Sequence, residues 1–333
     1  MHIDLTLVWA GIIGFAVFAY VVMDGFDLGI GILFPLLGRG QDRNAAINSV
    51  APVWDGNETW LILGGGGLLA AFPLAYAVIM SAVYTPVIAM LLGLVFRGVA
   101  FEFRARTARL WLWDAAFAGG SILAALAQGI TLGAVLQGIV VHGRAYGGGW
   151  WDWLTPFTLL TGVAVVIGYG LLGATWLIYR TEGNLQERCR TLAKGLALAT
   201  LAAVVAVSAA TPFLSYDYYS RWLRAPGIYA TAPIPLLVAG AGFLLYRSLT
   251  RRAELKPFLL ALSLFLLSFV GLGISMFPYV VPPSITLWQA ASPESSQIFM
   301  LVGVVIMVPV ILAYTGYAYW VFRGKVGHEG YHS

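Results

Sequence analysis

Long apolar stretches, separated by short polar connections, make up almost the whole chain. Nine of these stretches have roughly the 18 to 25 residues of a membrane-spanning helix, and only the first is longer. The predicted spans cover residues 7–37, 54–73, 76–100, 115–141, 155–179, 192–212, 229–246, 257–278 and 297–322. Because the connections are too short to fold separately, the pattern predicts an all-α integral membrane protein with a single transmembrane domain over residues 1–333.

The composition agrees with a bundle of helices in lipid. Hydrophobic residues make up 60% of the chain and charged residues 10%, whereas soluble globular domains carry roughly 25% charged residues. The mean hydropathy is +0.83. No basic residue precedes the first stretch, which is also too long for the apolar region of a signal peptide, so we expect it to be a retained span.

The basic residues indicate how the helices are oriented. Of the 19 Lys and Arg, 16 fall in or beside the connections after the first, third, fifth and seventh spans or in the C-terminal tail, and 3 fall elsewhere. The positive-inside rule therefore predicts an outside N-terminus and a cytoplasmic C-terminus. These loops explain the net charge of +4 without a nucleic-acid partner. An aromatic belt is expected at the same interface, formed by Tyr314, Tyr317, Tyr319 and Trp320.

Two aspartates interrupt the first predicted span, in the sequence YVVMDGFDLGIGILFP. Asp24 and Asp27 are three residues apart, so they share one face of a helix. An ionised carboxylate in the middle of a bilayer costs about 2.5 to 3.5 kcal/mol on insertion scales. One interpretation is that the pair caps a helix broken at the neighbouring glycines. The other is that the aspartates handle protons or face a partner.

A second acidic group opens the second predicted span, in the sequence PVWDGNETWLILGGGG. Asp55 and Glu58 could simply favour the positive end of the helix dipole. The predicted topology also places them at the cytoplasmic surface, near Asp24 and Asp27, so four carboxylates are expected where protons could enter. The glycine run 64–67 is tolerable in lipid where a neighbouring helix packs very close.

Other polar residues within the spans predict contacts between helices. Arg97 is the most deeply placed basic residue, and we expect it to pair with Asp55, Glu58 or Glu102. Most of the remaining arginines near it are expected to reach toward lipid headgroups. Gln128 is expected to form hydrogen bonds between helices.

The residues that would bind a redox cofactor are sparse. Haem needs axial His, Met or Cys ligands, and the four histidines lie at termini or span ends: His2, His142, His328 and His332. Cys189 is the only cysteine, and the methionines are expected to be packing residues. With no nucleotide or metal motif either, the chain by itself offers a possible proton route and no visible redox centre.

Several motifs resemble a known family. The sequences MDGFDLGIG, PVWDGNETWL, FRGVAFEFR, GYGLLGATWL and FPYVVPPSITLWQAASPESSQIFMLVGVVIMVPVILAYTGYAYWVFRGKV closely resemble subunit II of the bacterial cytochrome bd-type quinol oxidases. The resemblance is strongest to the cyanide-insensitive branch. Because long motifs match in the same order over nearly the whole chain, the resemblance is highly specific.

The resemblance implies a fold of nine transmembrane helices, arranged as two four-helix bundles plus one peripheral helix, in the bacterial inner membrane. It implies a partner, subunit I, that holds haem b and haem d, or b-type haems only, with no haem ligand from this chain. The complex would oxidise quinol, reduce dioxygen to water and generate a proton gradient by taking protons from the cytoplasm. Small accessory membrane subunits and a structurally bound quinone are left open.

The resemblance also suggests roles for single residues. Asp55 in the sequence WDGN matches a carboxylate near the entrance of a cytoplasmic proton pathway, and Trp60 matches a residue near the mouth of an oxygen tunnel. Asp24 and Asp27 match the family's DGFD motif, and the part played by Glu58 is left open. Two other functions remain: a purely structural subunit of the same complex, and an ion-coupled secondary transporter, for which matching interrupted helices are not seen.

Overall fold

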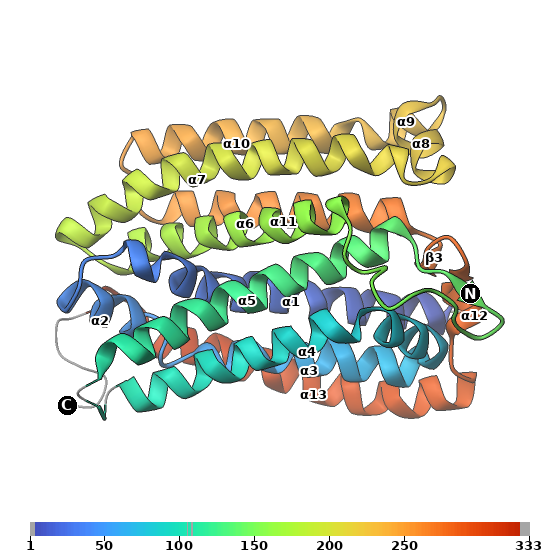
Figure 1. Ribbon diagram of the computed structural model, residues 1–333, viewed down its shortest axis with the longest axis horizontal. Helices are drawn as coiled ribbons and strands as arrows, with labels where there is room; N and C mark the ends of the chain where they lie inside the picture. The colour runs from blue at the N-terminus through green and yellow to red at the C-terminus, as the bar shows by residue number, and fades with distance from the viewer. Residues whose placement is uncertain (1–3, 105, 108, 327–333) are drawn as a thin grey trace.

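The computed structural model describes residues 4–326 except 105 and 108. These residues form nine helices of 18 residues or more, which lie side by side along one direction (Figure 1). The long helices are α1 (Leu5–Leu33), α3 (Trp54–Ala71), α4 (Pro73–Arg104), α5 (Leu110–Gln137), α6 (Pro156–Arg180), α7 (Gly183–Ala210), α10 (Pro233–Thr250), α11 (Leu255–Met276) and α13 (Glu294–Val321). Each overlaps one of the nine predicted spans.

Short elements join the long helices at the two ends of the bundle. The short helices are η1 (Phe34–Leu36), α2 (Gln41–Asn48), η2 (Thr211–Phe213), α8 (Tyr216–Leu223), α9 (Gly227–Thr231) and α12 (Leu287–Ala290). Two antiparallel hairpins pair β1 (Val141–His142) with β2 (Ala145–Tyr146), and β3 (Tyr279–Val281) with β4 (Ile285–Thr286). In the first hairpin Val141 lies opposite Tyr146, and the second contains an irregularity between Tyr279 and Val281.

Eight of the long helices in the described part of the chain are long and apolar enough to cross a membrane, which confirms an all-α membrane protein. The ninth, α3, carries Asp55 and Glu58 in its first two turns and contains five glycines, so its hydropathy is lower, and its status as a span stays a prediction. The helix α7 begins at Gly183, well before the predicted start at residue 192, because its first turns carry charged residues that a hydropathy pattern excludes.

The helices α1 and α6 form the centre of the packing. The helix α1 contacts α3, α5 and α6, while α6 also contacts α5, α7 and α11. At the crossing of α1 and α6, a Cβ atom added to Gly29 would overlap the carbonyl oxygen of Tyr169, and one added to Gly173 would overlap the backbone of Gly29. The glycines therefore let two backbones touch, as small residues do between membrane helices.

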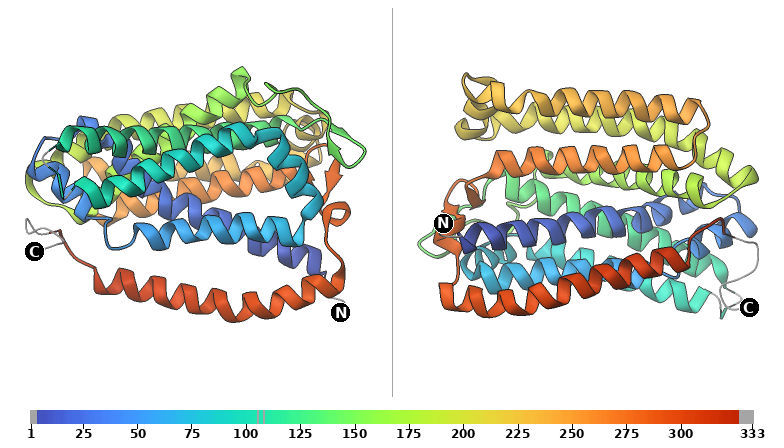
Figure 2. Two further views of the ribbon diagram at one scale, coloured as in Figure 1. Left: turned by 60° about the horizontal axis from the view of Figure 1, so that its bottom comes forward. Right: turned by 180° about the vertical axis from the view of Figure 1, so that it is seen from behind.

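The helix α13 lies at the edge of the molecule (Figure 2). It contacts α1 and α3, and Gln297 is its only buried residue. The start of α1 and the end of α13 lie at opposite ends of the bundle. The connections that carry most of the basic residues are gathered at the end where α13 finishes, while the two hairpins and α8 lie at the other.

Candidate functional site

A buried arginine bridges two carboxylates near the basic end of the bundle. The side chains of Arg97 on α4 and Asp24 on α1 are both 0% exposed, and Arg97 Nη1 donates a hydrogen bond of 2.6 Å to Asp24 Oδ1. The other terminal nitrogen of Arg97 lies 3.1 Å from Glu58 Oε1 on α3, an ion pair without hydrogen-bond geometry. One guanidinium thus joins three helices.

Of the three partners predicted for Arg97, only Glu58 is found beside it. Glu102 is exposed on the last turns of α4 and pairs with Arg106 at 3.5 Å, so the expectation that it pairs with Arg97 is wrong. Asp55 is exposed, and its carboxylate makes no hydrogen bond or ion pair with the described residues. The main partner, Asp24, was not among the predicted ones because the sequence does not show which faces of α1 and α4 meet.

The second aspartate is held by a different set of groups. Asp27 is fully buried, and the Asn57 side-chain amide donates a hydrogen bond of 2.8 Å to Asp27 Oδ2. The hydroxyl of Tyr319 on α13 donates to Asn57 Oδ1 at 2.9 Å. The interpretation of Tyr319 as part of an aromatic belt at the interface is therefore wrong, because its ring is half-buried and its hydroxyl points into the bundle.

A third group of polar side chains extends the cluster along α1. Tyr20 lies one helical turn before Asp24, and the Gln128 amide donates a hydrogen bond of 2.7 Å to its hydroxyl oxygen. The hydroxyl of Tyr169 on α6 donates to Gln128 Oε1, also at 2.7 Å. The prediction that Gln128 joins helices by hydrogen bonds is confirmed.

The charges of this cluster do not balance. The cluster holds three carboxylates, those of Asp24, Asp27 and Glu58, but one guanidinium, that of Arg97, which pairs with Asp24 and Glu58. Asp24 Oδ2 and Asp27 Oδ1 are buried and accept no hydrogen bond from the described residues. Buried polar atoms are nearly always bonded, and an unpaired buried charge is expensive, so these oxygens are positions at which a proton can be held.

The helix-capping interpretation of Asp24 and Asp27 does not fit the structure. The helix α1 runs unbroken from Leu5 to Leu33, so Asp24 and Asp27 cap no break. The residue before α3 is Val53, and no side chain caps that helix, although Asp55 lies in its first turn, where the helix dipole favours a negative charge. The structure thus brings Asp24, Asp27 and Glu58 together and leaves Asp55 at the surface nearby.

Trp60 lies on α3 against the first helix. Its side chain is buried, its ring meets that of Phe15 edge to face with centroids 5.6 Å apart, and its indole N–H has no partner among the described residues. It packs with Ala16, Ala19 and Tyr20 in a small apolar cluster. Its role at an oxygen tunnel stays a prediction.

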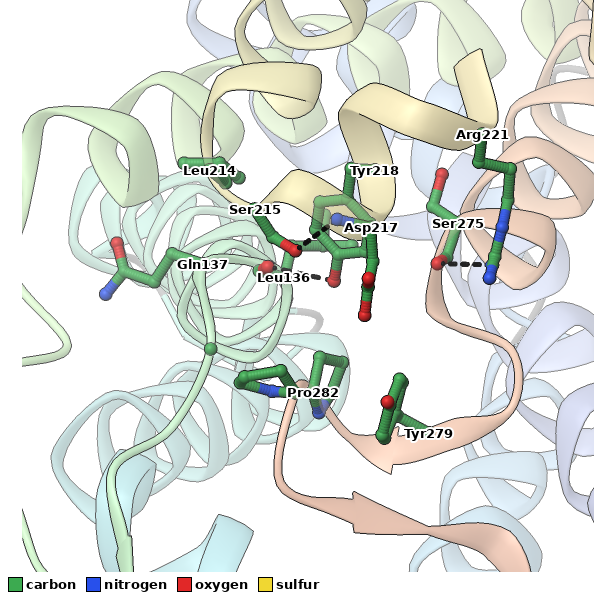
Figure 3. Close-up of a pocket in the computed structure, with 12 residues that line it drawn as sticks. Leu136, Gln137, Leu214, Ser215, Asp217, Tyr218, Arg221, Ser275, Tyr279 and Pro282 are labelled. Carbon is green, nitrogen blue, oxygen red and sulfur yellow. Dashed lines mark hydrogen bonds between the residues drawn. The ribbon is translucent and has the colours of Figure 1, made fainter. Parts of the chain in front are cut away.

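A cavity of about 100 Å³ lies at the opposite end of the bundle (Figure 3). The hydroxyl of Tyr218 on α8 donates to the Leu136 carbonyl at 3.1 Å, and Arg221 donates to the Ser275 carbonyl at 2.9 Å. Burial raises the pKa of Tyr218 to about 12, so its hydroxyl stays a donor at neutral pH. Small-molecule pockets usually measure roughly 300 to 1,000 Å³, so this cavity is too small for a quinone.

No group of three or more His, Cys, Asp or Glu side chains in the described part of the chain could hold a metal ion. His142 lies in β1 at the end of the bundle, while His2, His328 and His332 lie outside the described residues.

Four contributors to the site were not recognised as such from the sequence. Asn57 lies inside the motif PVWDGNETWL, between the carboxylates of Asp55 and Glu58. Tyr20 and Tyr169 carried no distinguishing sequence signal, and Tyr319 is one of several aromatics near the same helix end. The one available signal was Asn57 itself, a polar residue three positions before Trp60 in a predicted apolar span, because a buried polar side chain needs a hydrogen-bond partner.

The comparisons with known proteins agree over nearly the full length of the chain. The family model of cytochrome bd terminal oxidase subunit II matches residues 5–322. Cytochrome bd-I ubiquinol oxidase subunit 2 of Escherichia coli strain K12 is 33% identical, covering 98% of this chain and 96% of that protein. Cytochrome bd ubiquinol oxidase subunit 2 of Bacillus subtilis strain 168 is 28% identical, covering 96% of each.

The fold is also similar to that of a solved structure. A chain of the bd oxidase from Geobacillus thermodenitrificans superposes with a TM-score of 0.63 at 10% identity, covering 94% of this chain and 97% of that one. This likeness is one of fold alone, and the sequence matches decide the family. The chain belongs to the family of cytochrome bd terminal oxidase subunit II.

Proposed function

We propose that the chain is subunit II of a bacterial respiratory quinol oxidase and that its buried acid cluster passes protons from the cytoplasm toward a haem-bearing subunit I. The observation that carries this proposal is the placement of Arg97 between Asp24 and Glu58, with Asp27 beside them, near the basic end of the bundle. Dioxygen reduction consumes protons, and a membrane oxidase needs a route that brings them from one side only.

The proposed topology has nine spans, with the N-terminus outside and the C-terminus in the cytoplasm of a multi-pass inner-membrane protein. Its support is that the nine long helices, α3 included, alternate in direction, so that α1 starts and α13 ends at opposite ends. The grouping is two four-helix bundles, α1 with α3, α4 and α5, and α6 with α7, α10 and α11, with α13 at the edge. The positive-inside rule gives the orientation.

Exposure falls stepwise along the proposed route. Asp55 is exposed at the start of α3, the Glu58 side chain is 24% exposed, and Asp24 and Asp27 are fully buried. Arginine is not deprotonated in proteins, so Arg97 does not relay a proton. It instead holds Asp24 and Glu58 close to each other, and the carboxylates carry the protons.

Two helices offer a surface for subunit I. Ile62 on α3 is 74% exposed, and around Gly65 and Gly66 no atom of the described chain lies within 4 Å of an added Cβ. Such open small residues allow another helix to come close. Asp55 and Thr59 are exposed on the same helix, where contact with lipid would be costly. This surface, with α13 beside it, therefore suits a protein partner better than lipid.

The cofactors and substrates follow from this assignment. Subunit I would hold haem b and haem d, or b-type haems only, and quinol and dioxygen would react there. This chain would contribute proton delivery and, at Trp60, part of the wall of an oxygen path.

The purely structural alternative has one observation in its favour, since the Arg97 cluster also ties three helices together. The transporter alternative needs a helix broken beside its acids, and α1 is unbroken there.

The test is a conservative substitution in the purified two-subunit complex. Glu58→Gln removes a titratable group from the proposed route and keeps its shape, so the complex should assemble with normal haem spectra and turn over quinol slowly. Glu102→Gln, an exposed carboxylate outside the cluster, is the matched control and should leave turnover unchanged. Unimpaired turnover of assembled Glu58→Gln complex at all pH values would leave the purely structural function.

A further inference from the structure

The amide of Asn57 is the hydrogen-bond donor that the structure gives to Asp27. Asp24 has a cation within hydrogen-bond distance, whereas Asp27 accepts its bond of 2.8 Å from the neutral Asn57 side chain. An amide has a donor end and an acceptor end. Its effect on a carboxylate therefore depends on its orientation, because only the NH₂ end stabilises the charged form.

Tyr319 favours that orientation from another helix. Its hydroxyl donates to Asn57 Oδ1 at 2.9 Å, which keeps the carbonyl end of the amide toward α13 and the NH₂ end toward Asp27. A second, longer contact of 3.4 Å runs from the same NH₂ group to the Met23 carbonyl. If the amide turned over, its oxygen would face the carboxylate of Asp27, an arrangement that is favourable only when Asp27 carries a proton.

The ring of Tyr319 is positioned independently of its hydroxyl. It meets the ring of Trp176 on α6 edge to face, with centroids 6.2 Å apart, and Trp176 stacks on Phe26, the neighbour of Asp27, at 4.4 Å. Removing the hydroxyl alone should therefore leave the ring in place. The hydroxyl can then be tested without disturbing how α13 is seated.

We propose that Tyr319, acting through Asn57, is a positioning residue that keeps a hydrogen-bond donor turned toward Asp27 and so sets how readily Asp27 takes up a proton. The proposal rests on the proposed function in so far as Asp27 belongs to the proton route. It gives α13 a function: this helix, which has one buried residue, places a single hydroxyl against the acid cluster.

Every ionisable group near Asp27 must be considered in the test. These groups are Asp24 on the same helix, Glu58 on α3, Arg97 on α4 and Tyr319 itself on α13. Tyr319→Phe alters none of the first three. Its effect on the pH dependence of turnover can therefore be attributed to the orientation of the Asn57 amide.

The experiment compares Tyr319→Phe with Tyr317→Phe in the purified two-subunit complex. Tyr317 lies on the same helix and is 62% exposed, so it controls for loss of a hydroxyl from α13. In Tyr319→Phe, kcat should fall about fivefold, the effect of one lost hydrogen bond, with KM for quinol and dioxygen unchanged and the pH profile displaced toward alkaline pH. Tyr317→Phe should match the wild type in kcat, in KM for both substrates and in the pH profile.

A double variant and a spectroscopic signal separate this inference from the proposed function. In an Asp27→Asn background, Tyr319→Phe should cause no further fall in kcat, and an additive fall would overturn the proposal. Infrared difference spectra should show an Asp27 carboxyl band, identified by its loss in Asp27→Asn, that shifts in Tyr319→Phe. An unshifted band overturns the positioning role. A shifted band with normal turnover supports the positioning role and overturns the proton route through Asp27.

Discussion

Arg97→Met removes the cation of the acid cluster and keeps a side chain of similar length. The loss of folding free energy follows from the burial of the Arg97–Asp24 ion pair. Arg97 and Asp24 have fully buried side chains 2.6 Å apart, and removing one partner of such a pair costs roughly 3 to 5 kcal/mol because the other charge is left buried and uncompensated. The Glu58 side chain is 24% exposed, so loss of the Arg97–Glu58 ion pair adds no more than about 1 kcal/mol to this destabilisation.

The measurement is the unfolding of the purified complex in titrations with sodium dodecyl sulfate, followed by the loss of helical signal. Arg97→Met should shift the unfolding equilibrium by a factor of at least about a hundred, since about 1.4 kcal/mol corresponds to a factor of ten. Arg106→Met is the control. Its ion pair with Glu102 is exposed on both sides and 3.5 Å long, so its loss should change the free energy of unfolding by less than about 1 kcal/mol.

A double variant shows whether the buried charge is the cause. Adding Asp24→Asn to Arg97→Met removes the uncompensated carboxylate, so part of the lost stability should return, with a coupling energy of about 0.5 to 3 kcal/mol. If Arg97→Met and Arg106→Met were equally stable, the carboxylates around Arg97 would not be charged in the folded protein, and the reasoning would be refuted.

Three further predictions concern other parts of the chain. Reporter fusions after Arg252 and after Lys325 should indicate the cytoplasm and one after Pro293 the outside, and reversal at any of them contradicts nine spans. Gly29→Ala should prevent assembly of the complex, measured by co-purification with subunit I, because the added methyl overlaps the Tyr169 carbonyl; Gly14→Ala, which has open space, should assemble normally. A hydrogen bond from Lys325 holds the pKa of Glu254 below its usual range, so this contact stabilises the C-terminal segment above the usual pKa of Glu and is lost as the pH falls through the lowered value. Hydrogen exchange of residues 322–326, corrected for intrinsic rate, should therefore speed up in acid, and Glu254→Gln should remove this dependence; equal pH dependence in both proteins contradicts it.

Part of the site could be predicted because its signals are local. A carboxylate inside an apolar stretch is expensive wherever it lies, so Asp24 and Asp27 stand out without any knowledge of their neighbours. Glu58 was one of three partners expected for Arg97, because all three lie near the ends of helices that the predicted topology places on the same side, and the structure shows that Glu58 is the one beside it. The partner that matters most for Arg97, Asp24, did not follow from the same reasoning.

The sequence by itself determined that this is a helical membrane protein of the cytochrome bd subunit II family, because hydropathy and long motifs are properties of consecutive residues. Only the tertiary structure decided that α1 is unbroken, that Asp24 and Glu58 share one guanidinium, and that Tyr319 points inward to Asn57. The physical reason is that these contacts depend on how each helix is rotated about its axis. That rotation is set by packing, as where Gly29 lets α1 touch α6, and apolar residues on all sides of a helix leave no sign of it in the sequence.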